Sequence, residues 1–315
     1  MGHPELRYDI KTMKYYFEGW FHNKNKLGLD LMIQEGMDVD FQCYKNGEHW
    51  DAIPTYNSNN KYNWVVSLGQ FKKFEGHEGG TIYGPHIMLD GDAEKAKSIF
   101  QKNILYNCLS PWVGDMIKEI NPTFNCEPLP FAVNIEQFQP QKKDGKPIIY
   151  FKQVDRQRLN NVLEHLGNDF IVFDYEKRYE ESYFAEAISK APYAIWIGRH
   201  ESQGFAFQET LSSDTPIFVV DVKSCREEVN HGIPNAFWSE SYPSCKLAGT
   251  AASYFDDSCG LRTYPDRWKE DWDLFLSKDY EPREFIVKNL SAKPCLEIWN
   301  NKLRGLLDLK MYLST

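Results

Sequence analysis

The sequence predicts an α/β protein made of two Rossmann-like domains. Strand-like apolar runs alternate with helix-like amphipathic runs in both halves of the chain, and this alternation favours parallel sheets. The pattern is interrupted once, by a proline-rich stretch and a polar run, and then starts again. The chain has 315 residues, which is enough for two domains of ordinary size. We place the boundary near residue 140, with an N-terminal domain at 1–140 and a C-terminal domain at 141–315.

The first half contains fewer and less regular runs than the second. The expected elements, in chain order, are a helix at 14–34, strands at 62–68 and 80–87, a helix at 92–102, a strand at 104–109 and a helix at 112–120. No glycine-rich loop is found in residues 1–30, and the first domain is also short. Either this domain is shortened, or it contributes little to ligand binding.

The two halves are joined by an extended segment. Residues 126–140 contain three prolines, at 128, 130 and 140, and residues 141–146 (QKKDGK) are polar. Proline-rich and polar stretches of this kind are typical of linkers between domains.

The second half follows a regular β-α-β-α-β-α-β order, as expected of a Rossmann-like domain. Its strands are expected at 147–152, 170–175, 193–197 and 217–222, and its helices at 156–166, 182–190 and 205–213. From residue 266 onward the chain is mostly helical, and we expect the last helices to pack back on the N-terminal domain.

Composition narrows the function classes. The net charge of −9 argues against non-specific nucleic-acid binding, which needs a surplus of Lys and Arg. No apolar run approaches the roughly 20 residues that span a bilayer. The seven cysteines are scattered and form no CxxC pair, as expected of a reduced protein. We expect a soluble protein in the cytoplasm, or in the host cytoplasm if the source is a virus.

Two glutamates stand out by their context. Glu201 and Glu209 follow the buried strand predicted at 193–197, and Gly204 lies between them where a helix begins. Ligands bind at the carboxyl ends of strands in open α/β sheets, and a helix N-terminus can hold an anion. The spacing alone is weak evidence, because Glu119 and Glu127 share it. The alternative is a pair of surface or capping glutamates at a helix start.

The run GRHESQGFAFQETLSSDTPIFVVD at 198–221 resembles the retaining glycosyltransferases of the GT-B fold, in glycosyltransferase family four. Members of that family often carry a stretch close to ESxGxxxxEAxxxxxPV, the E-x7-E signature. Ser202, Gly204, Glu209 and Pro216 match it in register. The linker PFAVNIEQF at 130–138 and the run at 254–260 are also similar to passages of the family.

The resemblance implies a GT-B fold, with two Rossmann-like domains facing a central cleft. It also implies that Glu201 lies near the transferred sugar and that Glu209 accepts the ribose hydroxyls of the nucleotide. A carboxylate with two hydroxyl donors makes strong, charge-assisted hydrogen bonds. The donor-binding loop would then consist of Ser202, Gln203, Gly204 and Phe205.

The family places two cations, six residues apart, after the first strand of the second domain, where they hold the donor diphosphate. Lys152 and Arg158 have this spacing here, although the family order is Arg and then Lys. Arg156 is an alternative to Arg158 as the second cation that holds the diphosphate. Arginine binds phosphate in a bidentate way, whereas lysine acts as a point charge. The alternative is an ordinary solvated start of a helix.

Three further features are weaker candidates. His86 ends a predicted strand of the first domain and is a candidate contact to the sugar or acceptor; the alternative is a plain loop residue. Tyr175 follows a strand of the second domain and is a candidate contact to the base. The DxD triplets at 38–40 and 90–92 are interpreted as turns rather than as metal sites.

The resemblance implies a retaining, metal-independent glycosyltransferase, a hexosyl- or pentosyltransferase of the compact bacterial or large-DNA-virus type. Its donor would be a UDP- or GDP-linked sugar, with no other cofactor required, and its acceptor a glycan, a glycoconjugate or another hydroxyl compound. Two alternatives stay open: a nucleotide-sugar epimerase of related two-domain fold, and a noncatalytic glycan-binding relative.

Overall fold

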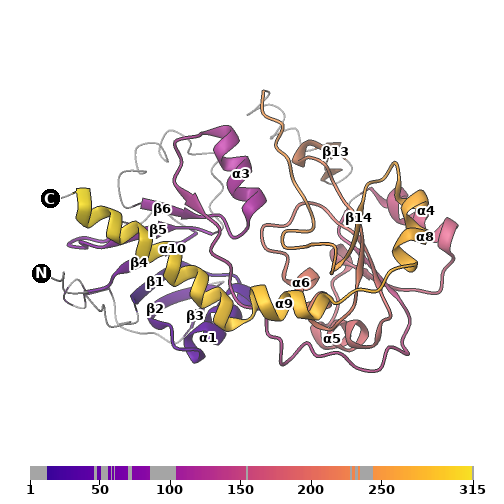
Figure 1. The fold of residues 1–315 in the computed structure, drawn as a ribbon, viewed down its shortest axis with the longest axis horizontal. Helices are drawn as coiled ribbons and strands as arrows, with labels where there is room; N and C mark the ends of the chain where they lie inside the picture. Colours follow the sequence, from indigo (N-terminus) through magenta and orange to yellow (C-terminus); the bar gives the residue numbers. More distant parts are fainter. Residues whose placement is uncertain are drawn as a thin grey trace, which may run out of the picture. The chain divides into compact units, whose positions relative to one another are not determined.

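The computed structural model forms two compact units (Figure 1). The first comprises Met1–Asn107 and Leu296–Thr315, and the second Cys108–Cys295. The boundary predicted from the sequence lies further along the chain, near residue 140. The structure describes residues 13–45, 48–50, 56–57, 59, 61–69, 73–85, 104–153, 155–227, 229–230, 233–234 and 244–313.

A seven-stranded sheet, counted over the described residues, has the strand order β3-β2-β1-β4-β5-β6-β7. The pairs β2–β1, β1–β4, β4–β5 and β5–β6 are parallel, and β3 is antiparallel to β2. The elements of this part of the chain are β1 (Lys14–Trp20), α1 (Asn23–Gln34), β2 (Asp38–Lys45), β3 (Glu48–Trp50), β4 (Trp64–Leu68), β5 (Gly80–Tyr83), β6 (Ile104–Asn107), α3 (Pro111–Ile120) and β7 (Cys126–Glu127).

The helix predicted at 14–34 is wrong in its first part, where the chain forms strand β1. Tyr15, Tyr16 and Phe17 are consecutive and fully buried. A central strand covered on both faces lacks the alternating pattern of a half-exposed strand, and a continuous apolar run of this kind does not distinguish a strand from a helix. Gly19 has φ +125°, and a Cβ there would lie 2.2 Å from the Leu68 carbonyl oxygen, so β1 and β4 meet closely only because residue 19 lacks a side chain.

The turn predicted at 38–40 is also wrong, because these residues begin strand β2. The Asp40 carboxylate lies 3.0 Å from Lys14 Nζ and accepts a hydrogen bond of 2.8 Å from the Tyr62 hydroxyl. Both contacts tie β2 to neighbouring parts of the same unit. The predicted helix at 92–102 and the triplet at 90–92 lie outside the described residues.

The chain ends on the first unit. Helix α10 (Ala292–Leu313) brings Trp299 against β1, with ring centroids 6.0 Å from Tyr15 and 5.7 Å from Phe17. The Tyr15 hydroxyl donates a hydrogen bond of 3.1 Å to Asn300 Oδ1. The other side of β1 presents Tyr16 to a second aromatic cluster with Tyr62 and Phe74. The core of the unit is therefore built on both faces of its central strand.

The second unit contains a five-stranded sheet, again over the described residues, with the order β14-β11-β10-β8-β9 and all pairs parallel. Its elements are β8 (Ile148–Phe151), α4 (Arg156–Leu166), β9 (Ile171–Asp174), the 3-10 turn η2 (Tyr175–Lys177), α5 (Glu181–Lys190), β10 (Ala194–Ile197), α6 (Phe205–Ser212), β11 (Ile217–Val220), the 3-10 turn η3 (Cys225–Glu227), β12 (Val229–Asn230), β13 (Ile233–Pro234), β14 (Gly260–Thr263), α8 (Trp268–Leu276) and α9 (Pro282–Leu290).

The predicted β-α-β-α-β-α-β order is confirmed, and β14 extends it. Helix α4 begins where predicted because the Asp155 side chain accepts a hydrogen bond of 3.1 Å from Gln157 N, which satisfies one of the free amides of the first turn. It ends at Gly167, which has φ +88°. Numbered along the chain, the parallel strands of both sheets have the same order, 2-1-3-4-5, so the predicted pair of Rossmann-like units is confirmed.

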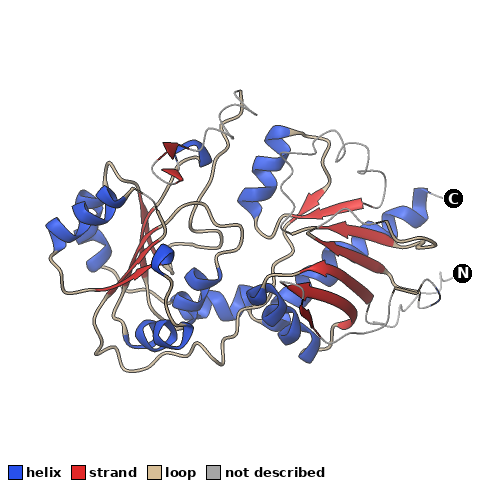
Figure 2. Ribbon diagram, turned by 180° about the vertical axis from the view of Figure 1, so that it is seen from behind, coloured by secondary structure: helices blue, strands red, loops and turns tan. Residues whose placement is uncertain are grey.

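Helices cover both faces of the second sheet (Figure 2). On one face α4 and α8 pack on β8, β10 and β11, with Trp268, Trp272 and Phe275 in the cluster. On the other face α5 and α6 supply Phe184 and Phe207, which contact Tyr150 and Trp196 edge-on. The strands are therefore buried on both sides, and the carboxyl edge of the sheet remains as the place for a site.

No helix in the described part of the chain is long and apolar enough to cross a membrane.

Candidate functional site

The carboxyl edge of the second sheet carries the predicted site. Strands β8 and β10 are neighbours, and the strand order reverses between them, because β9 follows β8 on one side and β11 follows β10 on the other. At such a switch point the connections leave in opposite directions and open a crevice in which ligands bind. Lys152 directly follows β8, and the segment that leads to Glu201 follows β10. The sequence placed both residues at strand ends, and the topology makes those strands neighbours.

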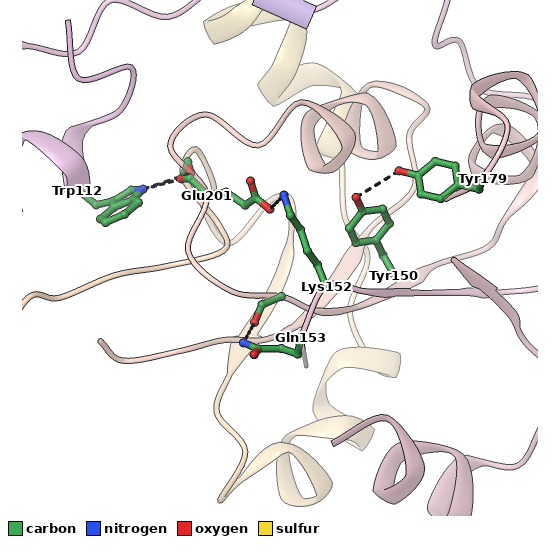
Figure 3. A network of polar contacts seen from close by, with 8 residues as sticks. Trp112, Tyr150, Lys152, Gln153, Tyr179 and Glu201 are labelled. Atoms are coloured by element: carbon green, nitrogen blue, oxygen red, sulfur yellow. Dashed lines mark hydrogen bonds and ion pairs between the residues drawn. The ribbon is translucent and has the colours of Figure 1, made fainter. Parts of the chain in front are cut away.

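Lys152 and Glu201 form an ion pair (Figure 3). Lys152 Nζ lies 2.5 Å from Glu201 Oε1, with side-chain exposures of 14% and 16%. The ammonium also lies 4.2 Å from the centroid of the Tyr175 ring, a cation–π contact. Water screens a pair this far buried only weakly, so each side chain is stabilised in its charged form mainly by the opposite charge of its partner. Lys152, Glu201 and Tyr175 come from the ends of three different strands.

The main chain of Glu201 is held on both sides. Its amide donates to the Thr250 carbonyl at 3.0 Å, and its carbonyl accepts from Trp112 Nε1 at 2.9 Å. The Ser253 hydroxyl donates to the same carbonyl. Figure 3 shows Trp112 reaching this carbonyl from the side opposite Lys152. The carboxylate therefore projects from a backbone that has little freedom to move.

Helix α6 begins directly after this loop. Gly204, at its N-cap, has φ +78° and ψ +57°, a left-handed conformation that glycine adopts without strain. Glycine has no side chain to cap the helix, so the first amides of α6 are available to an anion. Phe205 opens the helix and is half-buried, and Ser202 is exposed.

Glu209 lies one turn into α6 and is 4% exposed. A pair of tyrosines connects its surroundings with those of Glu201: the Tyr179 hydroxyl donates to the Tyr150 hydroxyl at 3.2 Å. Burial raises the pKa of Tyr179 to about 12; the hydrogen bond to Tyr150 works against this shift and the negative charge of Glu209 adds to it. Burial is the largest cause of the raised pKa of Tyr150. The neighbouring Tyr179 and then the negative charge of Glu201 raise it further. Both glutamates thus act on one tyrosine pair.

The two arginines of α4 differ in their partners. Arg158 Nε lies 3.7 Å from Asp155 Oδ2, and Arg158 Nη1 is buried without a hydrogen-bond partner among the described residues. Arg156 is half-exposed, forms an ion pair with Asp174, and lies 5.5 Å from the Phe151 ring centroid. Arg158 therefore retains a buried donor for a ligand, whereas Arg156 is engaged within the protein.

The side chain of Gln203 is also used within the protein. Its Oε1 accepts from Phe131 N at 3.0 Å, and its Nε2 donates to the Phe131 carbonyl at 2.6 Å. A glutamine that pairs with both main-chain groups of one residue acts like a short strand. These two bonds fix the segment around Phe131 on the loop that contains Gln203.

Sequence reasoning missed Gln153, which follows Lys152. It is 3% exposed, and its Nε2 donates to the Gly198 carbonyl at 2.6 Å, which joins the ends of β8 and β10. Its Oε1 is buried and has no hydrogen-bond partner in the described chain. Its place directly after a predicted strand was the available signal.

His86 lies outside the described residues. Among the residues that the structure does describe, no group of three or more His, Cys, Asp or Glu side chains is arranged to hold a metal ion.

The comparisons with known proteins concern the fold. A sucrose-phosphate synthase from Thermosynechococcus elongatus matches with a TM-score of 0.51 and 12% identity, over 96% of this chain and 100% of that chain. The lipopolysaccharide outer core galactosyltransferase WaaB, in its apo form, matches with a TM-score of 0.59 and 10% identity, over 93% and 99%. The chain has the GT-B fold. The sequence matches no protein-family model and no curated protein.

The GT-B fold agrees with the two units of parallel sheet described above. At identities this low the likeness extends to the fold and not to the reaction. The switch point of the second sheet, where Lys152, Glu201 and Tyr175 meet, is the candidate site of this GT-B chain.

Proposed function

We propose that this protein is a retaining glycosyltransferase that moves a sugar from a nucleoside-diphosphate sugar to a hydroxyl acceptor without a metal ion. The observation that carries the proposal is the Lys152–Glu201 ion pair at the switch point of the second sheet. The GT-B fold supports it, because the two structures compared above bear the names of a sucrose-phosphate synthase and a galactosyltransferase.

The cations would bind the donor diphosphate. The Lys152 ammonium sits beside the site, and Arg158 offers a buried Nη1 donor without a partner among the described residues. The free amides at the start of α6 add partial positive charge. These groups are in place before the reaction, so they can stabilise negative charge as it develops on the leaving diphosphate. In this chain they would do the work that a bound divalent cation does elsewhere.

The two glutamates would bind the two sugar rings of the donor. Glu201, paired with Lys152, would accept hydroxyls of the transferred sugar. Glu209 is 4% exposed, so a ribose hydroxyl bound there would make a charge-assisted bond with little competition from water. Tyr175, which is 46% exposed, would contact the base or cover Lys152.

The reaction would proceed on one face of the sugar. The acceptor oxygen forms a bond to the anomeric carbon as the bond from that carbon to the diphosphate oxygen breaks. The proton of the acceptor hydroxyl passes to the departing diphosphate oxygen. Attack and departure on the same face retain the anomeric configuration. We propose that the N-terminal domain binds the acceptor, a glycan or glycoconjugate, and that the donor carries UDP or GDP.

The test is incubation of the protein with UDP- and GDP-linked sugars, with EDTA present, with and without a panel of glycan acceptors. NMR of the product reports the anomeric configuration. Transfer with retention supports the proposal, and inversion refutes it. Conversion of the donor sugar without acceptor indicates the epimerase. Binding without any turnover indicates a noncatalytic relative.

A matched pair of variants tests the site. Glu201→Gln removes the charge that faces Lys152, and Glu164→Gln removes an exposed charge from α4. We expect a loss of turnover in the first variant only. Equal turnover in the two variants would exclude Glu201 from the reaction.

A further inference from the structure

Asp221 is a buried carboxylate next to the site. It directly follows β11 and is 1% exposed. Its Oδ1 accepts from Val222 N at 2.8 Å and from Ala251 N at 2.7 Å, and its Oδ2 accepts from the Thr250 hydroxyl at 2.5 Å. A buried charge is tolerated when hydrogen bonds surround it, as here. Two of the three bonds go to the segment at 249–253, which we call the clasp.

The clasp holds Glu201. The Thr250 carbonyl accepts the hydrogen bond of Glu201 N at 3.0 Å, and the Ser253 hydroxyl donates to the Glu201 carbonyl. Trp112 Nε1 lies 3.3 Å from the Ser253 hydroxyl oxygen as well as 2.9 Å from the Glu201 carbonyl oxygen. A continuous chain of bonds therefore runs from Asp221 through Thr250 to the main chain of Glu201.

Packing leaves the clasp little room to shift. A Cβ on Gly198 would lie 2.7 Å from Ala251 Cβ, and one on Gly249 would lie 3.4 Å from His200 Cβ. The clasp thus packs closely against the segment that ends in Glu201, because the contact positions 198 and 249 are glycines without side chains. A displaced clasp would carry Glu201 with it.

We propose that Asp221 and Thr250 are positioning residues for the Glu201 carboxylate. The inference rests on the proposed function, since it assigns these two residues a part in the same reaction. Glu201 contacts Lys152 at 2.5 Å, and a shift of its backbone would lengthen this contact and reorient the carboxylate. A geometric error of this kind acts on the transition state more than on donor binding.

The experiment compares Thr250→Val with Thr263→Val. The Thr263 hydroxyl donates to Asp271 Oδ2 at 2.6 Å in the same unit, so both variants remove a threonine–aspartate hydrogen bond, and only one of these bonds leads to Glu201. We expect kcat to fall roughly 10- to 100-fold in Thr250→Val, with the KM for the donor within about twofold. Thr263→Val should keep the kcat of the wild type, and Thr250→Ser should restore kcat to within about twofold.

A second readout needs no activity. The ¹³Cε resonance of Lys152, assigned with Lys152→Met, reports the ion pair with Glu201 and should move in Thr250→Val but not in Thr263→Val. If Thr250→Val fails to fold by circular dichroism, Asp221→Asn takes its place, because its Oδ1 can still accept from Val222 N and Ala251 N.

Equal kcat values and equal Lys152 resonances in the two threonine variants would overturn the positioning role. A wild type that is inactive towards every donor would refute the proposed function instead, and the Lys152 resonance would still decide the inference.

Discussion

Replacement of Glu209 by glutamine tests the nucleotide side of the site. Glu209 is 4% exposed in α6, and glutamine preserves its shape, so no cavity is created. A hydrogen bond to a charged group contributes about 1.5–3 kcal/mol, and a neutral one about 1 kcal/mol. The carboxylate can accept a hydrogen bond from each of two ribose hydroxyls. The amide of glutamine has only one acceptor oxygen, so it would lose one of these hydrogen bonds and keep the other in a weaker, neutral form. We expect binding of UDP or GDP to weaken by about 2–3 kcal/mol, roughly 30- to 150-fold in Kd.

The assay is calorimetric titration of the Glu209→Gln and wild-type proteins with the ribonucleotide and with its 2′-deoxy analogue. The wild type should prefer the ribonucleotide, and the variant should lose most of that preference, because the hydroxyl then has no carboxylate to bind. Tyr179→Phe is the matched control, since it removes a neighbouring hydroxyl that donates to Tyr150. If the variant discriminates between the two nucleotides as strongly as the wild type, Glu209 does not bind the ribose.

Three further predictions follow from single side chains. Arg158→Met should weaken binding of a nucleoside diphosphate at least tenfold while leaving that of the nucleoside unchanged, because only the phosphates meet the guanidinium; equal losses in calorimetry would contradict this. Gln203→Ala should lower the free energy of unfolding by about 1–3 kcal/mol in urea denaturation, because it removes two buried hydrogen bonds to the Phe131 main chain; an unchanged midpoint would contradict it. Burial lowers the pKa of Lys143 to about 8 from 10.5, so the unfolded chain binds more protons between these values and stability should rise with pH across that window. Lys143→Met should flatten the rise, and a parallel pH profile in thermal unfolding would refute the assignment.

Local patterns predicted the elements of the second unit well. Each strand there is a short apolar run between polar turns, and each helix has a clear start, such as the Asp155 cap of α4. The first unit was predicted less well. In β1 three successive buried aromatics removed the alternation by which a strand is recognised, and β2 begins with two aspartates that are typical of a turn.

Spacing by itself could not separate a site from a structural contact. Glu119 and Glu127 have the same spacing as Glu201 and Glu209. Yet Glu119 accepts hydrogen bonds from Lys246 N at 2.6 Å and Leu247 N at 3.0 Å, so its carboxylate ties α3 to a distant loop. The buried strand before Glu201 was the additional signal, because it placed that glutamate at the carboxyl end of a sheet.

The sequence alone determined the α/β class, the order of elements in the second half and the strand ends from which Lys152 and Glu201 project. These properties depend on neighbours along the chain, where hydrophobic period, caps and turns act over a few residues. Only the tertiary structure decided that Lys152 meets Glu201, that Gln203 binds Phe131 and that Asp221 holds the clasp. In a parallel sheet adjacent strands are joined by long crossovers, so the partners of a site residue lie tens of positions away and no local pattern records them.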